Sequence, residues 1–150
     1  MLSPAPIRAI YSSPSTRAIE TIAPLADRLG LTVELVPDLR ERELPVVPLT
    51  DFDDQIRECW DHPKRAIPSG ESNAAAQARA TATLRALLAR HAGEHVVLAT
   101  HGNLLTLTLH ALDPAVGYEF WRALSFPDVY RLTFDGGALV AIARKWQPSR

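Results

Sequence analysis

The segment 95–112 (HVVLATHGNLLTLTLHAL) constrains the fold more than any other part of this chain. It opens with residues 96–99, a continuous apolar run with the length and β-branched content of a strand. After a polar corner at residues 100–103, apolar residues return at helical spacing: Leu104, Leu105, Leu107, Leu109 and Leu112. A strand that is apolar on both faces is typical of an inner strand in an α/β sheet. The segment therefore predicts a buried strand, a tight corner and a helix.

His101 lies at that corner, between the carboxyl end of the strand and the N-terminus of the helix. In α/β sheets, ligands bind outside the carboxyl ends of strands, where helix N-termini offer free N–H groups to anions. Gly102 has no side chain, which lets a ligand approach the backbone closely. Taken alone, the His-Gly pair is better explained by a loop histidine that hydrogen-bonds the backbone. The case for a site therefore depends on the rest of the chain.

The other hydrophobic patterns alternate between strands and helices. Expected strands are 7–11, 32–36, 129–134 and 138–144, and expected helices are one ending at Leu29 before Gly30, then 51–60, 73–91, one after Asn103 and 118–124. Ser13 and Ser15 are candidate caps of the first helix, and residues 135–137 (DGG) predict a hairpin turn. This order predicts a single domain over residues 1–150, a three-layer α/β/α sandwich with a mostly parallel mixed sheet.

The composition excludes several classes of protein. Hydrophobic residues make up 47% and charged residues 22%, which are ordinary globular values. The formal net charge of −1 supplies no basic field, so we expect no nucleic-acid partner. The single cysteine, Cys59, fits a reducing compartment, and no apolar run reaches the length of a membrane span. We therefore expect a cytoplasmic protein that needs no membrane and no cofactor.

A zinc site is a weaker alternative. Two pairs have ligand-like spacing, Cys59 with His62 (C-x2-H) and His91 with His95 (H-x3-H). Pro63 and Gly93 interrupt the local geometry, and an Ala-rich helix accounts for His91 without metal, so no metal is expected. Serine-hydrolase and Walker-type nucleotide chemistry are disfavoured because neither a G-x-S-x-G nor a G-x-x-x-x-G-K-[ST] motif occurs.

A second strand-to-helix corner, residues 12–17 (SSPSTR), also carries polar side chains. Because parallel strands place their carboxyl ends at one edge of a sheet, we expect it to lie beside residues 100–103. Arg17 falls in the first turn of its helix, and a guanidinium binds phosphate oxygens bidentately. An imidazole beside it, His101, can donate to a phosphate oxygen or stabilise transition-state charge. The two corners therefore predict a small anionic ligand.

Glu41 lies in the charged loop 38–44 (DLREREL) and is a candidate proton donor to a leaving oxygen. The commoner alternative is a solvated carboxylate paired with Arg40 or Arg42. The spacing alone favours that alternative.

Several motifs together resemble the histidine phosphatase superfamily, the phosphoglycerate-mutase-like proteins. Residues 12–21 (SSPSTRAIET) resemble its SSPxxRAxET signature. Residues 39–42 (LRER) resemble its L-x-E segment, 70–72 its GES helix start and 100–102 (THG) its second catalytic histidine motif. Residues 117–121 (GYEFW) and 127–130 (PDVY) are similar to a branch of small bacterial members. The resemblance covers essentially the whole chain in the right order.

The resemblance implies a role for each residue of the expected site. Arg17 would grip the phosphoryl group, and His101 would be the second histidine, which stabilises that group during transfer. Glu41 would be the general acid, and the backbone N–H of Gly102 or Asn103 would help bind phosphate. In the family mechanism a nucleophilic histidine attacks phosphorus, and water then releases phosphate from the phosphohistidine. The implied ligand is a small phosphorylated metabolite, or a phosphate or sulfate anion.

One part of the family pattern is missing from the printed residues: no Arg-His-Gly motif occurs, so the implied nucleophile is absent. We interpret the other four histidines, His62, His91, His95 and His110, as structural. A first strand and helix, roughly 30 residues, are then expected to be missing. A misassigned start, a fragment and a natural pseudoenzyme would each account for this. Two functions stay open: a phosphomonoesterase active in a longer form, and a non-catalytic phosphate-ester-binding or interaction module.

The missing strand also bears on the sheet. By the resemblance it would lie beside residues 96–99, and its loss would leave unpaired edges that favour pairing with another chain. We therefore expect residues 96–99 to gain a replacement neighbour, either residues 129–134 or a second subunit. The second case predicts a homodimer through exposed sheet edges.

Overall fold

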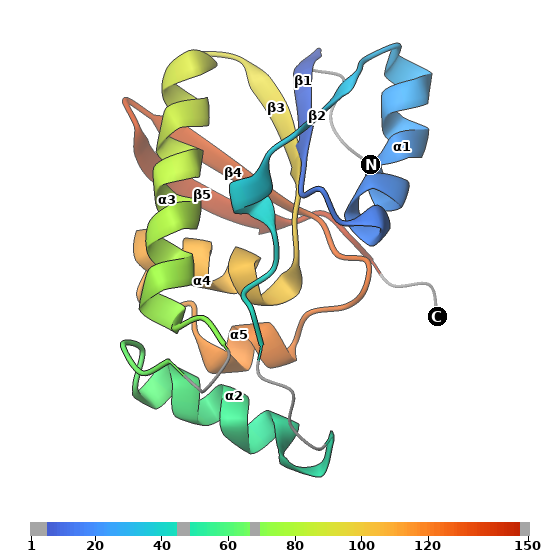
Figure 1. The fold of residues 1–150 in the computed structure, drawn as a ribbon. Helices are drawn as coiled ribbons and strands as arrows, with labels where there is room; N and C mark the ends of the chain where they lie inside the picture. Colours follow the sequence, from blue (N-terminus) through green and yellow to red (C-terminus); the bar gives the residue numbers. More distant parts are fainter. Residues whose placement is uncertain (1–5, 45–48, 67–69, 148–150) are drawn as a thin grey trace.

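The structure is a computed structural model that describes residues 6–44, 49–66 and 70–147 (Figure 1). In chain order the strands are β1 (Ile7–Ser12), β2 (Val33–Leu35), β3 (His95–Ala99), β4 (Tyr130–Asp135) and β5 (Ala138–Arg144). The α-helices are α1 (Thr16–Leu29), α2 (Phe52–Asp61), α3 (Asn73–Arg90), α4 (Gly102–Leu112) and α5 (Tyr118–Arg122), with short 3-10 turns at Pro37–Leu39 and Leu49–Asp51. The predicted order of elements is confirmed.

The main sheet has three parallel strands in the order β2-β1-β3. Ile10 pairs with Val33 on one side of β1 and with Val97 on the other, so β1 is the middle strand. The prediction that residues 96–99 form an inner strand is therefore wrong for the described part of the chain: β3 lies at an edge. The apolar side chains of β3 are explained by α1 and α3, which pack against the two faces of the strand (Figure 1). They do not indicate whether another strand pairs with β3 at its side.

Strands β4 and β5 form a separate antiparallel hairpin, which corrects the expectation of one mixed sheet. Its two-residue turn holds Gly136 and Gly137 at φ +55° and +82°, as the DGG sequence predicts. Within the described residues β4 pairs with β5 alone, so the expected pairing of residues 129–134 with 96–99 is also wrong. In a hairpin closed by a two-residue turn, the two strands form their backbone hydrogen bonds with each other, so β4 needs no pairing with β3.

The core has three parts that fix the layers. Under α1, Ile10 and Ile22 pack with Ala26, Val97 and Ala99. On the opposite face of the sheet, Tyr11 packs with Leu39, Leu87 and Leu98. The third cluster joins α3 to α4 through Ala76, Ala80, Leu104 and Leu107. Helices thus cover both faces of the sheet. Because β1 and β3 are parallel, their carboxyl ends lie at the same edge.

The helix ends follow the sequence signals with one exception. Gly30 closes α1 in the left-handed conformation at φ +64°, and the Ser72 hydroxyl caps α3 by accepting from the Ala75 N–H at 3.1 Å. Ser15 precedes α1 without a side-chain capping bond; instead its N–H donates to the Ser13 hydroxyl at 3.3 Å. No helix within the described ranges is long and apolar enough to cross a membrane.

Candidate functional site

The two polar corners lie side by side, as predicted. Ser12 pairs with Ala99 in the parallel ladder, and the Ser13 N–H donates to the Ala99 carbonyl at 2.9 Å. The loop that carries Glu41 joins them, because the Thr100 hydroxyl donates to the Leu39 carbonyl at 2.8 Å. Three segments distant in sequence therefore meet at the carboxyl edge of the sheet.

Arg17 and His101 are in direct contact. The Nε and Nη2 atoms of Arg17 lie 3.2 and 3.1 Å from His101 Nδ1. A guanidinium has only donors, so Nδ1 of His101 must be the unprotonated acceptor. His101 Nε2 then carries the proton and donates to the Ser13 hydroxyl at 2.8 Å. The contacts thus select one neutral tautomer of His101.

The same surroundings hold His101 neutral at physiological pH. Burial, followed by the positive charges of Arg17 and Arg79, lowers the pKa of His101 to about 4. The ring is 7% exposed, whereas Arg17 is exposed to solvent. The site therefore presents an exposed guanidinium above a buried, uncharged imidazole.

Glu41 lies at the N-terminus of α4. Its Oε1 accepts the N–H groups of Arg42 at 2.8 Å and Leu104 at 2.9 Å, and its Oε2 accepts the N–H of Asn103 at 3.1 Å. The interpretation of Glu41 as a solvated carboxylate paired with Arg40 or Arg42 is therefore wrong, because orphan N–H groups of a helix attract a carboxylate more strongly than an exposed side chain does.

Two consequences follow for Glu41 and its neighbours. Burial raises the pKa of Glu41, against the lowering effect of its three backbone hydrogen bonds and the charge of Arg17. The Asn103 N–H, expected to bind phosphate, already donates to the Glu41 carboxylate. In this structure the Glu41 side chain therefore occupies a backbone N–H group that was expected to bind phosphate.

At Gly102 the space that a side chain would occupy is filled by other side chains. A Cβ at this position would lie 3.1 Å from a ring carbon of Phe126 and 3.2 Å from Leu124. The close approach that the glycine allows is therefore made by residues of the α5–β4 connection. The Asn103 side chain is buried beside it, and its Oδ1 has no hydrogen-bond partner.

Arg79 is a residue that sequence reasoning missed. Its Nε and Nη2 atoms each donate to a different carboxylate oxygen of Glu71 at 2.8 Å. Its remaining donors reach three carbonyls of the Glu41 loop: Asp38 at 2.7 Å, Arg40 at 3.0 Å and Glu41 at 3.2 Å. The only signal in the sequence was an isolated basic residue about two turns after Glu71 in an Ala-rich helix.

Arg42, which the sequence predicts only as a surface partner of Glu41, lies in the interior. Its side chain is 2% exposed, and Nη1 donates to Asn73 Oδ1 at 2.7 Å and to the Glu71 carbonyl at 3.2 Å. Nη2 contacts Cys59 Sγ at 3.5 Å, and Nε is buried without a partner. Arg42 thus anchors the Glu41 loop to α2 and α3.

The remaining histidines lie elsewhere. His91 bridges Tyr11 and Glu94 with hydrogen bonds of 2.7 Å each, and His110 Nδ1 contacts the Val116 carbonyl at 2.6 Å. Cys59 faces the cationic Arg42, which does not favour the zinc alternative. In the described part of the chain, no three His, Cys, Asp or Glu side chains are grouped as metal ligands.

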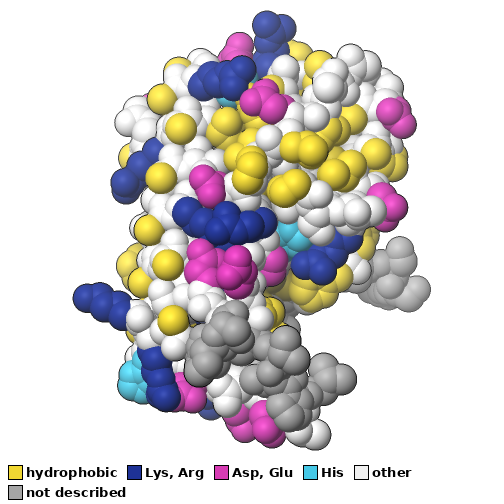
Figure 2. Space-filling view, in the orientation of Figure 1, with side chains coloured by type: hydrophobic (Ala, Val, Ile, Leu, Met, Phe, Trp, Pro, Cys, Tyr) yellow, Lys and Arg dark blue, Asp and Glu magenta, His cyan; other side chains and the backbone are white. Residues whose placement is uncertain are grey.

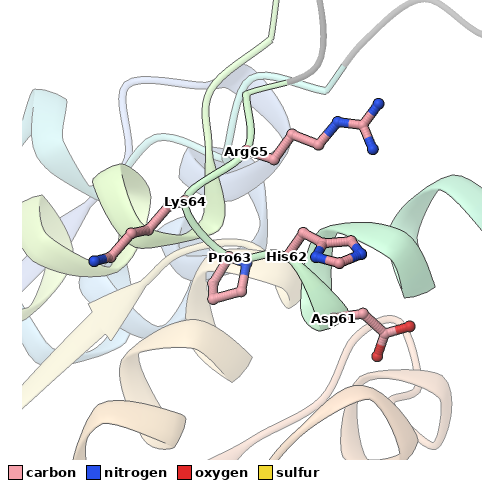
Figure 3. Close-up of a pocket in the computed structure, with 5 residues that line it drawn as sticks. All are labelled: Asp61, His62, Pro63, Lys64 and Arg65. Atoms are coloured by element: carbon pink, nitrogen blue, oxygen red, sulfur yellow. The ribbon is translucent and has the colours of Figure 1, made fainter.

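A shallow hollow of about 430 Å³ lies at the C-terminal end of α2 (Figure 3). It is lined by consecutive residues, Asp61, His62, Pro63, Lys64 and Arg65, whose side chains point in different directions. None of the residues of the two corners lines it. We therefore assign the candidate site to the corners and not to this hollow.

Comparison with known families agrees with this geometry. Residues 1–146 match the histidine phosphatase superfamily (branch 1), and the chain belongs to that family. Family membership inferred from the motifs is thus confirmed. No curated protein matches the chain.

Solved structures show the same fold. YhfR of Bacillus stearothermophilus is 24% identical, with a TM-score of 0.74 over 99% of this chain and 78% of that chain. A mycobacterial glucosyl-3-phosphoglycerate phosphatase in complex with VO3 is 25% identical, with a TM-score of 0.67 over 95% of this chain and 78% of that one. Its complex with inorganic phosphate gives 29% identity and a TM-score of 0.59, over 79% of this chain and 64% of that one. This chain thus spans between 64% and 78% of the length of these structures.

Proposed function

We propose that the corner formed by Arg17 and His101 binds the phosphoryl group of a small phosphate monoester. The observation that carries the proposal is the exposed Arg17 guanidinium, seated on the buried imidazole of His101 at 3.1–3.2 Å. Support also comes from the family match and from the mycobacterial phosphatase, which is described in complex with phosphate and with VO3. Arginine forks match the oxygens of phosphate bidentately.

Binding would move a proton. When Arg17 turns its donors to phosphate, the lone pair on His101 Nδ1 loses its partner and faces an anion. Protonation of Nδ1 converts this repulsion into a charge-assisted hydrogen bond, while Nε2–H stays on the Ser13 hydroxyl. We therefore expect phosphate binding to be coupled to proton uptake by His101.

Glu41, Gly102 and Asn103 complete the proposed site. A buried carboxyl with a raised pKa suits a proton donor to a leaving oxygen, which is the proposed role of Glu41. The Gly102 N–H is the proposed additional phosphate donor. The Asn103 N–H can contribute only when Glu41 releases it.

We further propose that these 150 residues by themselves bind the ester with little or no turnover. The printed residues contain no Arg-His-Gly motif, and in the described part no second histidine contacts Arg17 or His101. A covalent route needs a nucleophile in line with phosphorus. A phosphomonoesterase that is active in a longer form of the protein is the alternative.

The test is phosphate binding by the purified 150-residue chain, followed by calorimetry. Arg17→Met should abolish saturable binding, whereas the matched control Arg28→Met, on the exposed end of the same helix, should retain it. Equal binding by both variants would contradict the proposed site. Hydrolysis of p-nitrophenyl phosphate that disappears in His101→Ala would contradict the absence of turnover and favour the enzyme.

A homodimer stays a separate proposal. β3 pairs with β1 on one side, and no strand of the described residues pairs with its other side. Open strand edges favour pairing with a second copy. Sedimentation equilibrium should then show a dimer, and a monomer at high micromolar concentration would contradict it. A cytoplasmic location likewise remains a prediction.

A further inference from the structure

Phe126 is the most exposed large hydrophobic residue of the described chain. Its side chain is 80% exposed, compared with 59% for Val140 and 50% for Leu35. Holding an aromatic ring in water forgoes the free energy of its burial. The position of this ring therefore needs an explanation.

Phe126 lies in a loop, residues 125–129, that several hydrogen bonds hold in place. The Asp128 carboxylate accepts from Arg144 Nε and Nη2 at 2.9 and 2.8 Å, and from the N–H groups of Ser125 and Val129 at 3.0 and 2.9 Å. The Ser125 hydroxyl also accepts from Arg144 and donates to the Pro127 carbonyl. These contacts brace the residues on both sides of Phe126, so the backbone that carries its ring is held by the surrounding structure.

The ring lies beside the proposed phosphate site. Two of its carbons are 3.1 and 3.2 Å from the position a Cβ would take on Gly102, the residue that follows His101. Figure 2 shows that basic, acidic and hydrophobic side chains gather close together near the middle of this face. Gly102 is the residue that leaves room for this packing.

We propose that Phe126 is a specificity-determining residue that forms the apolar wall of the site and selects phosphate monoesters with a flat, aromatic alcohol part. This inference rests on the proposed function, because the phosphoryl group must be held by Arg17 and His101. The charged end of the ester then faces the guanidinium and the ring of the ester packs against Phe126.

The chemistry favours aryl over polyol esters. An exposed aromatic face makes offset-stacked or edge-to-face contacts with another ring, whereas a polyol gains little there and loses hydration. An aromatic pair of this kind corresponds to roughly 2- to 10-fold in affinity. The contacts to the phosphoryl group are the same for all esters. A difference in affinity between phenyl phosphate and glycerol 3-phosphate therefore measures the contact with Phe126.

The experiment measures calorimetric affinities of the 150-residue chain for inorganic phosphate, glycerol 3-phosphate and phenyl phosphate. We expect phenyl phosphate to bind about 5- to 10-fold more tightly than glycerol 3-phosphate. Phe126→Ala should remove this preference and leave the affinity for inorganic phosphate unchanged. Val140→Ala, a matched loss of an exposed hydrophobic side chain on β5, should keep the preference.

The outcomes separate this inference from the proposed function. Binding of inorganic phosphate without a preference for phenyl phosphate, or a preference that survives in Phe126→Ala, would overturn the role of Phe126 and leave the phosphate site intact. Failure of both inorganic phosphate and phenyl phosphate to bind would overturn both. As a direct readout, the ring protons of Phe126 should shift in the NMR spectrum with phenyl phosphate and not with inorganic phosphate.

Discussion

Replacing His101 by glutamine tests the electrostatics of the site most directly. In the folded protein the pKa of His101 is lowered from 6.5 to about 4, first by burial and then by Arg17 and Arg79. Each pKa unit corresponds to about 1.4 kcal/mol, so the difference amounts to roughly 3 kcal/mol as an upper bound. Solvent screening near the exposed Arg17 reduces it, and about 2 kcal/mol is our expectation.

The direction follows from proton linkage. Between pH 6.5 and 4 the unfolded chain binds a proton at His101 and the folded chain does not, so this stabilisation is complete above pH 6.5 and is lost as the pH falls to about 4. Glutamine preserves an acceptor for Arg17 and a donor for Ser13 but does not titrate. The difference in unfolding free energy between the wild type and His101→Gln should therefore shrink by about 2 kcal/mol from pH 7 to pH 4.

Urea unfolding of both proteins at half-unit pH intervals measures that difference, and contributions of other titrating groups cancel in it. An NMR titration gives the pKa of His101 directly; Arg17→Met should raise it, and Arg28→Met should not. If the two stability curves run parallel from pH 7 to pH 4, or if the ring titrates near 6.5, the argument that Arg17 and burial keep His101 neutral is refuted.

The remaining predictions concern stability and use the same unfolding assay. Arg42→Met should cost about 3 kcal/mol because it leaves the Asn73 and Glu71 acceptors unpaired, whereas the exposed Arg40→Met should cost less than about 1 kcal/mol; equal losses would contradict the anchor. Gly30→Ala should cost about 1 kcal/mol, since a Cβ there meets no atom within 4 Å and only the backbone conformation at φ +64° is strained; a neutral result would argue against that conformation. Leu107→Ala, at 1% exposure, should cost about 2–5 kcal/mol, and a loss below 1 kcal/mol would mean that α3 and α4 do not pack as described.

Local signals predicted most of the fold. The order of helices and strands, the Gly30 end of α1 and the Gly136–Gly137 turn each depend on residues that are near neighbours in sequence. The edge position of β3 and the separate β4–β5 hairpin were not predicted, because hydrophobic periodicity describes the two faces of a strand and not the strands beside it.

The sequence likewise predicted one part of the candidate site and not another. The contact between Arg17 and His101 followed from parallel topology, since both corners come at the carboxyl ends of their strands. The position of Glu41 beside the N-terminus of α4 did not, because it depends on Arg42 and Arg79. Their contacts include Asn73 and the carbonyls of Glu71, Asp38 and Arg40, which are 29 to 41 residues away from the arginine that binds them. Main-chain acceptors have no sequence signature.

Arg79 grips the loop before α2 through the carbonyls of Asp38, Arg40 and Glu41, and not through their side chains. Every residue type offers the same backbone carbonyl. Substitutions at positions 38 and 40 can therefore change the side chains of this loop without moving Glu41. Position 79 has no such freedom, because a lysine ammonium cannot match two carboxylate oxygens and three carbonyls with one planar fork. The side chains along this loop can therefore be exchanged while a single distant arginine preserves the path of its backbone.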